Sequence, residues 1–129
     1  MPTAKRKHYR HLPAFILLAL TEKPAHGGAI KSLLEGWLPG FTADSAALYR
    51  ALQTLEKEGA VTSAWDTTPP GPARRVYQVT PRGWQELGQW RDDIEKRLKL
   101  LRSFLDHYDR LREKAPLPEP APTMEDNAR

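Results

Sequence analysis

Residues 44–61 read DSAALYRALQTLEKEGAV, and this stretch decides the fold. Leu48, Leu52 and Leu55 recur at helical spacing, which places them on one face of a helix. Asp44 is a favourable N-cap, and glycine, here Gly59, is the residue type that most often follows a helix end. The stretch therefore predicts an amphipathic helix over residues 44–58. The opposite face of that helix carries Ser45, Tyr49, Arg50, Gln53, Thr54 and Lys57.

Two shorter helices are expected before this stretch. Apolar residues at helical spacing predict one helix over 13–21, which Pro13 opens at a position that suits proline. A second helix is predicted over 26–35, because Gly36 and the turn residues that follow it stop the pattern. His26 stands at the start of this second helix, where a capping role or a buried, hydrogen-bonded role is a better interpretation than metal ligation.

After the central helix the pattern changes to that of strands. Residues 60–65 and 75–79 are rich in strand-forming types, and the segment between them, 66–74, is too long and proline-rich for a tight turn. We expect this segment to project as a loop with a basic exit at Arg74 and Arg75. These two arginines are open to two interpretations, a solvated edge or a phosphate contact.

Residues 81–113 are expected to form one long helix. Thr80 is its predicted cap, and Pro81 suits its first turn. Apolar residues recur along it at the spacing of a coiled-coil seam, and the helix would span roughly 45–50 Å, which implies a partner chain. The predicted dimerisation seam consists of Leu87, Ile94, Leu98, Leu101, Leu105 and Tyr108. A flanking row consists of Trp90, Phe104 and Leu111.

The two ends of the chain differ from its centre in composition. Residues 1–11 form a basic arm, whose four cations match the net charge of +4 of the whole 129-residue chain. This arm is either a solubilising tail or a contact to DNA phosphates. Residues 115–129 are proline-rich and poor in apolar types, which predicts disorder. The cations of the arm are Lys5, Arg6, Lys7 and Arg10.

Several classes of protein are excluded or disfavoured. The chain has no cysteine, so it holds no disulfide and no thiolate metal site, which fits a cytoplasmic protein. The apolar run at 12–20 is too short to span a membrane; a secretory signal is disfavoured because cleavage would remove a helix that the next segments need. No catalytic or phosphate-loop motif is present, so we expect no enzyme, no metal and no cofactor.

The order of the elements points to DNA. Three short helices followed by a β-ribbon form the winged helix-turn-helix arrangement, so the fold class is mainly α with a small β-wing and a long C-terminal dimerisation helix. The third helix offers a polar face that fits a major groove of about 12 Å. The expected division is a flexible arm over 1–11, a DNA-binding domain over 12–80, a dimerisation helix over 81–114 and a tail over 115–129.

The chain also resembles the PadR-like transcriptional regulators, from about residue 12 to residue 90. The resemblance rests on LLAL at 17–20, HGGAI at 26–30, ALYRALQTLEKEGAV at 47–61 and GPARRVYQVTPRG at 71–83. The single C-terminal helix is similar to that of the smaller subfamily. Some members of the family bind planar aromatic molecules between tryptophans at the dimer centre, so the resemblance makes Trp90 and Phe104 candidates for an effector site.

The chain departs from the family pattern at several positions. Gly28 stands where the family usually has tyrosine, Ala47 replaces a common threonine, and Arg50 replaces a frequent proline. The operator sequence therefore cannot be carried over from the family.

Together these observations predict a sequence-specific DNA-binding regulator, a repressor that binds an inverted repeat as a homodimer. The predicted DNA-binding residues are Ser45, Tyr49, Arg50, Gln53, Arg74, Arg75, Lys5, Arg6 and Lys7. The alternative is an interaction adaptor, in which the winged domain docks another protein and contacts DNA weakly. It draws support from the net charge of −1 over residues 44–58.

Overall fold

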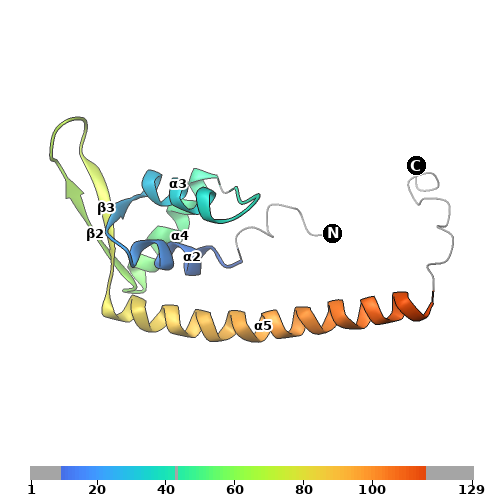
Figure 1. The fold of residues 1–129 in the computed structure, drawn as a ribbon. Coiled ribbons are helices and arrows are strands. Elements are labelled where there is room, and N and C mark those ends of the chain that lie inside the picture. Colours follow the sequence, from blue (N-terminus) through green and yellow to red (C-terminus); the bar gives the residue numbers. More distant parts are fainter. Residues whose placement is uncertain (1–9, 43, 116–129) are drawn as a thin grey trace, which may run out of the picture. The chain divides into compact units, whose positions relative to one another are not determined.

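The computed structural model describes residues 10–42 and 44–115. The chain divides into two units, one up to Arg91 and one from Asp92, and each is described by itself. The three short helices, the two long strands and the long helix predicted from the sequence are confirmed, with ends shifted by one or two residues. In chain order the elements are α2 (Leu12–Leu20), β1 (Ala25–His26), α3 (Gly27–Trp37), α4 (Ser45–Lys57), β2 (Val61–Asp66), β3 (Arg74–Val79) and α5 (Pro81–Lys114) (Figure 1).

Side chains at the helix starts satisfy backbone N–H groups that have no partner within the helix. Asp44 Oδ1 accepts a hydrogen bond from the Ala47 N–H of α4 at 2.7 Å. His26 Nδ1 accepts one from the Ala29 N–H of α3 at 3.3 Å. The capping role predicted for Asp44 is therefore confirmed, and of the two roles left open for His26 the structure shows the capping one.

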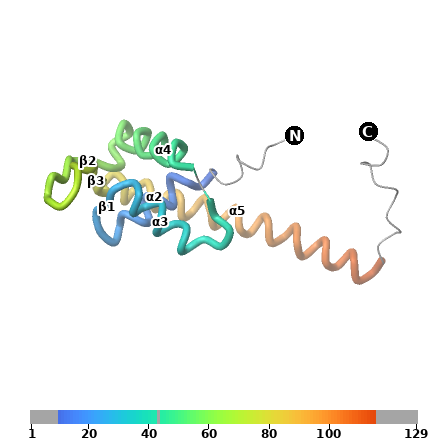
Figure 2. The backbone as a smooth tube through the Cα atoms, turned by 90° about the horizontal axis from the view of Figure 1, so that it is seen from above, coloured from blue at the N-terminus to red at the C-terminus, as the bar shows by residue number. Residues whose placement is uncertain are grey.

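The sheet contains three antiparallel strands in the order β1-β3-β2. The two-residue strand β1 was not predicted, because two residues are too few to show an alternating pattern. Arg74, expected in the loop, pairs with Asp66 at the ends of β3 and β2, so the loop is shorter than predicted. The remaining loop, residues 67–73, projects past the short helices in two views (Figures 1 and 2).

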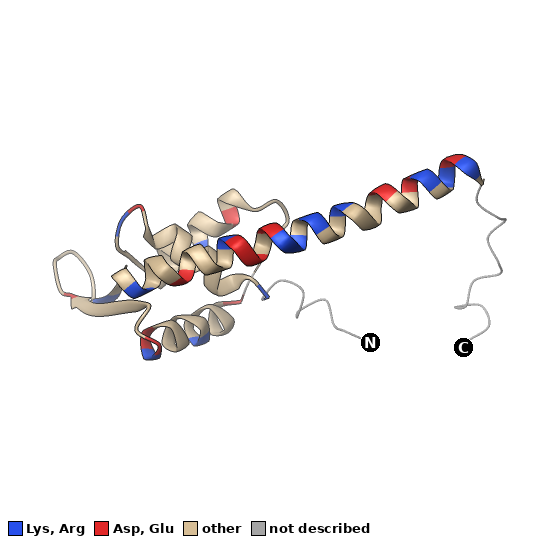
Figure 3. Cartoon of the chain, turned by 90° about the horizontal axis from the view of Figure 1, so that it is seen from below, with Lys and Arg blue, Asp and Glu red and all other residues tan. Residues whose placement is uncertain are grey.

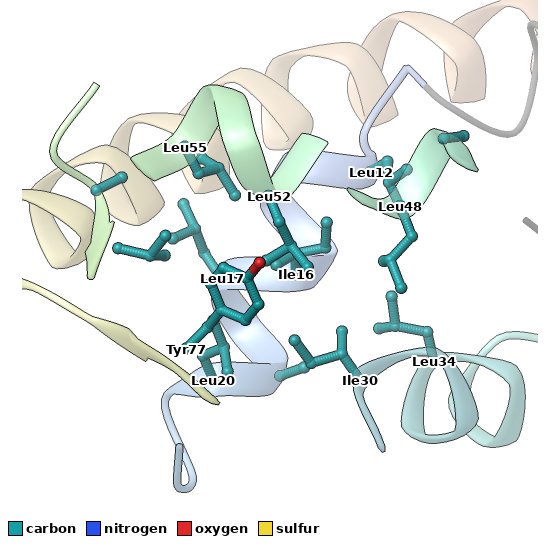
Figure 4. Packing of buried hydrophobic residues seen from close by; sticks show 14 residues of the cluster. Leu12, Ile16, Leu17, Leu20, Ile30, Leu34, Leu48, Leu52, Leu55 and Tyr77 are labelled. Atoms are coloured by element: carbon teal, nitrogen blue, oxygen red, sulfur yellow. The ribbon is translucent and has the colours of Figure 1, made fainter. Parts of the chain in front are cut away.

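The first unit has one hydrophobic core. Side chains from α2, α3, α4 and the sheet converge on it (Figure 4). Helix α2 lies at its centre, and Leu18 is its one large apolar side chain with substantial exposure, at 43%. The most deeply buried large side chains are Leu12, Ile16, Leu17, Leu20, Ile30, Leu34, Leu48, Leu52, Leu55 and Val61.

The start of α5 is tied to the turn between α4 and β2. Thr80 Oγ1 donates a hydrogen bond to the Gly59 carbonyl at 2.6 Å and accepts one from the Gly83 N–H at 3.0 Å, which confirms the predicted cap. The Thr80 N–H also donates to the Ala60 carbonyl at 3.0 Å. A side chain at Gly83 would overlap that same carbonyl, so the close approach requires glycine. These contacts fix the wing against the end of α4.

The second unit holds the C-terminal part of α5. Its leucines are largely exposed: Leu98 at 54%, Leu101 at 56% and Leu105 at 56%. Phe104 stacks on Tyr108, with ring centroids 6.4 Å apart. None of the helices in the described ranges combines the length and apolar content that crossing a bilayer requires.

Candidate nucleic-acid interface

The predicted recognition residues share one exposed face of α4. Ser45, Tyr49 and Gln53 follow one another at four-residue spacing, so they form a row along the helix. Arg50 lies beside this row, and all four side chains are exposed. The leucines of the opposite face are at most 1% exposed, and their burial fixes the rotation of the helix. The sequence therefore positions a polar row that solvent, or a DNA groove, can reach.

Tyr49 of α4 packs against α3 and is also partly exposed. A side chain at Gly27 would overlap the Tyr49 ring, so this ring lies directly against the backbone at the start of α3. Tyr49 nevertheless remains 43% exposed. The contact holds the ring in place while leaving one side accessible. Sequence reasoning did not identify Gly27 as the residue that makes room for Tyr49.

The two wing arginines do not form one basic pair. Neighbouring residues of a strand point to opposite faces of the sheet, so Arg74 and Arg75 face opposite ways. The Arg74 Nη1 atom lies 2.8 Å from His26 Nε2. The Arg75 guanidinium lies 5.3 Å from the centre of the Trp65 ring. The two arginines therefore have different neighbours and lie on different faces of the sheet.

Arg75 belongs to a contact between the wing and the recognition helix. Ser63 Oγ of β2 donates a hydrogen bond to Glu56 Oε2 of α4 at 2.6 Å. The same Glu56 oxygen lies 3.9 Å from Arg75 Nη2. An ion pair this long and this exposed contributes little stability, so Arg75 retains the freedom to turn toward a phosphate. The hydrogen bond from Ser63 is the firmer link.

The neutral His26 ring has one nitrogen that can accept a hydrogen bond, but two donor groups lie next to the ring. A neutral imidazole carries one N–H, so only one ring nitrogen accepts. The Ala29 N–H and the Arg74 guanidinium are both donors, and they lie at opposite nitrogens of this ring. A neutral His26 therefore accepts from the start of α3 or from Arg74, but not from both at once. Arg74 is thus held less firmly than its 2.8 Å contact alone indicates.

Negative charge lies close to Arg74. The Thr68 N–H donates to Asp66 Oδ1 at 2.9 Å, and this hydrogen bond lowers the pKa of Asp66 below its ordinary value, with a smaller contribution from the Arg74 charge. Asp66 is thus ionised at neutral pH and offsets part of the Arg74 charge. On the other face, Glu56 does the same for Arg75. In the described ranges no cluster of His, Asp and Glu could hold a metal ion.

Other predicted site residues are placed less completely. Lys5, Arg6 and Lys7 lie outside the described residues. Trp90 is half-buried, and its ring meets that of His11 edge-to-face at 5.8 Å. Phe104 is 66% exposed and stacks on Tyr108, as described above. The two effector candidates therefore lie in different ring pairs.

The sequence is similar to that of a known protein family. A family model described as "Transcriptional regulator PadR-like family" matches residues 16–89, which is more than half of the chain. No curated protein matches the chain.

Three solved structures show the same fold. A PadR family regulator from Clostridium difficile is 21% identical, with a TM-score of 0.66 over 74% of this chain and 98% of its own. A transcriptional regulator from Clostridium thermocellum is 22% identical, with a TM-score of 0.69 over 81% and 98% of the two chains. A PadR-like regulator from Bacillus cereus is 19% identical, with a TM-score of 0.63 over 74% and 91%.

Proposed function

Because the chain belongs to the transcriptional regulator PadR-like family, we propose that it is a sequence-specific repressor that binds an inverted-repeat operator as a homodimer. The observation that carries this proposal is the exposed row on α4. A helix held rigidly by buried leucines presents Ser45, Tyr49, Arg50 and Gln53 to solvent. Arginine and glutamine are side chains that read base edges in the major groove.

The wing and the arm add contacts that carry no sequence information. Arg74 and Arg75 reach the DNA backbone from opposite faces of the wing. Lys5, Arg6 and Lys7 in the arm over 1–11 add non-specific affinity. In this division residues 12–80 bind DNA, residues 81–114 dimerise, and residues 115–129 form a tail.

Dimerisation is supported by the exposed apolar surface of α5. Soluble monomers rarely leave a continuous apolar stripe in water, and such stripes mark association surfaces. Leu98, Leu101 and Leu105 are each more than half exposed. Leu87 and Ile94 are half-buried, and Tyr108 is 42% exposed. A twofold dimer through this seam would present two copies of α4 to an inverted repeat. Trp90 and Phe104 are proposed to contribute to any site for a small aromatic effector.

The test is a selection from a pool of random duplexes at about 150 mM salt, a concentration that suppresses non-specific binding. We expect the retained duplexes to share a palindrome. An Arg50→Ala variant with an intact fold should lose preference at particular positions of that palindrome. Retention without any common sequence would contradict the proposal.

A second candidate function, a protein-docking adaptor, is favoured by one observation. Both wing arginines have acidic neighbours within the chain, Asp66 and Glu56, which reduces the positive charge that the wing offers to DNA. Salt dependence separates the two functions, because each phosphate contact contributes about −0.9 to the log–log slope of affinity against salt. An adaptor would show no steep slope with duplex DNA.

A further inference from the structure

The His26 ring joins the start of α3 to the wing. Its Nδ1 atom accepts a hydrogen bond from the Ala29 N–H at 3.3 Å, and its Nε2 atom lies 2.8 Å from Arg74 Nη1. The ring also lies close to the backbone of α3, because a Cβ atom at Gly28 would be 3.3 Å from two of its atoms. These contacts hold the ring with one nitrogen toward α3 and the other toward Arg74.

The charge of the ring decides how many of its neighbours it can bind. A neutral imidazole has one nitrogen that accepts a hydrogen bond, whereas an imidazolium carries two N–H groups and accepts none. Histidine is the side chain whose charge ordinarily changes between pH 5 and 8. A proton added to His26 therefore removes the acceptor and places a second positive charge beside the Arg74 guanidinium.

The elements packed against β1 surround His26 with positive groups. Strand β3 contributes Arg74, and α3 contributes the positive end of its helix dipole. The titratable residue that α4 places nearby is Tyr49, which lies against Gly27. The exposed residues just before β1 have opposite charges, Glu22 and Lys23. A proton on His26 is thus added between two positive groups, Arg74 and the start of α3.

Asp66, the cross-strand partner of Arg74, keeps its charge across this pH range. Its side chain accepts a hydrogen bond from the Thr68 N–H, which lowers the pKa of Asp66 below its ordinary value. It therefore offsets the same part of the Arg74 charge at each pH. A change at Arg74 between pH 5 and 8 is thus assigned to His26 rather than to Asp66.

The positive charge of the wing comes from two side chains. Within residues 61–79 the cations are Arg74 and Arg75, and the loop at 67–73 carries no charged residue (Figure 3). Arg75 lies near Trp65 on the opposite face of the sheet from Arg74. A restraint on Arg74 therefore acts on half of the positive charge that the wing can offer to a phosphate.

We propose that His26 is a positioning residue for Arg74, which restrains Arg74 when neutral and releases it when protonated, so that the wing binds DNA more tightly as the pH falls. The proposal rests on the DNA-binding function proposed above and adds a form of regulation to it. The regulation is confined to one face of the wing, because Arg75 has no contact with His26 in the described ranges.

The two charge states of His26 differ in what DNA binding must break. With neutral His26, moving Arg74 onto a phosphate breaks a charge-assisted hydrogen bond, although the ring can then accept from Ala29 alone. With protonated His26 there is no such bond to break, and moving Arg74 away relieves a repulsion between two cations. The contact is exposed, so we expect an added gain in affinity of about two- to fivefold on protonation.

The test measures the affinity of the full chain for one duplex at about pH 8 and about pH 5.5, at constant ionic strength. His26→Asn keeps a side chain that favours helix starts and does not titrate. We expect the gain on acidification to be about two- to fivefold larger for the unmodified chain than for His26→Asn. His107→Asn on α5 is the matched control and should keep the full gain. The arm histidines, His8 and His11, are present in every variant and cancel.

The same comparison in an Arg74→Ala background separates positioning from direct contact. If His26 acts through Arg74, the chains with and without His26→Asn should show equal gains once Arg74 is removed. A difference that persists in Arg74→Ala would mean that His26 itself contacts the DNA, and this result would overturn the positioning role. Circular dichroism at both pH values checks that each variant is folded.

A measurement without DNA tests the restraint itself. Nuclear magnetic resonance relaxation of the Arg74 Nε–H group should show a more mobile side chain at about pH 5.5 than at about pH 8 in the unmodified chain. In His26→Asn the mobility should not depend on pH. Equal mobility at both pH values in the unmodified chain would overturn the proposal even if DNA binds.

The remaining outcomes distinguish this proposal from the function on which it rests. DNA binding with the same pH dependence in the unmodified chain and in His26→Asn would overturn the role of His26 and leave the DNA-binding function standing. Failure to bind any duplex at either pH would overturn the DNA-binding function and the regulation together, whatever the mobility of Arg74.

Discussion

Helix α4 and the C-terminal part of α5 both carry leucines at helical spacing, but these leucines are buried in α4 and exposed in α5. Leu48, Leu52 and Leu55 of α4 are at most 1% exposed. In α5, Leu98 and Leu101 are 54% and 56% exposed. The repeat thus specifies a helix with an apolar face, and the neighbours decide what that face does. In α4 it holds the fold together, whereas in α5 it is available to a second chain.

The largest expected effect comes from truncating a leucine of α4. Leu52→Ala should lower the free energy of unfolding by about 2–5 kcal/mol, because it removes buried contacts and leaves a cavity. Leu100→Ala, at a position 68% exposed on α5, is the matched control and should change it by less than about 0.5 kcal/mol. Urea unfolding measures both. Equal losses of unfolding free energy in the two variants would contradict the difference in burial between α4 and the C-terminal part of α5.

Charged residues introduced on the α5 seam should prevent association without unfolding the winged unit. Leu98→Asp combined with Leu101→Asp should give monomers in sedimentation, because the dimer would have to bury unpaired carboxylates. The winged unit should stay folded, since neither leucine belongs to its core. Leu100→Asp is the control, being exposed and off the seam. A persistent dimer in the double variant would show that the seam lies elsewhere.

The two glycines of α5 allow a packed position and an open position to be compared within one helix. Gly83→Ala should destabilise the chain by about 1–3 kcal/mol, because the new methyl group overlaps the Ala60 carbonyl. Gly88→Ala meets nothing within 4 Å and should stabilise the helix by about 0.5–1 kcal/mol. Thermal unfolding of both variants measures the difference. A stabilising Gly83→Ala would mean that α5 does not start tightly against the α4–β2 turn.

The smallest expected effects are those of the wing arginines. Arg74→Ala and Arg75→Ala should each flatten the salt slope of DNA binding by about one unit and leave the preferred sequence unchanged. Because the two side chains lie on opposite faces of the sheet, their effects should add in the double variant. Affinity titrations at several salt concentrations provide the slopes. Unchanged slopes in all three variants would remove the wing from the DNA interface.

Local patterns predicted most of the fold. Helical spacing located α2, α3, α4 and α5, and the caps at Asp44 and Thr80 follow from residue types that favour helix starts. The loop at 67–73 follows from its prolines. These features depend on neighbours close in the chain, which a single sequence displays.

The features that sequence reasoning missed depend on contacts distant in the chain. Strand β1 exists because β3 pairs with it, and two residues show no alternation of their own. The link from Ser63 to Glu56, and the space that Gly27 leaves for Tyr49, join separate elements. The opposite directions of Arg74 and Arg75 could have been predicted, since alternation along a strand is local. We grouped both residues as the exit of the loop, and this interpretation overlooked the alternation of their side chains.

The most direct test of the account compares one duplex that carries the selected palindrome with one that carries a single half-site. Titration by fluorescence anisotropy, with sedimentation for the stoichiometry, is done for the unmodified chain and for the Leu98→Asp/Leu101→Asp variant. The account predicts two unmodified chains on the palindrome. It also predicts that the variant keeps its half-site affinity and loses the tighter binding to the palindrome. A variant that binds the palindrome as tightly as the unmodified chain would contradict the division into a DNA-reading unit and an associating helix.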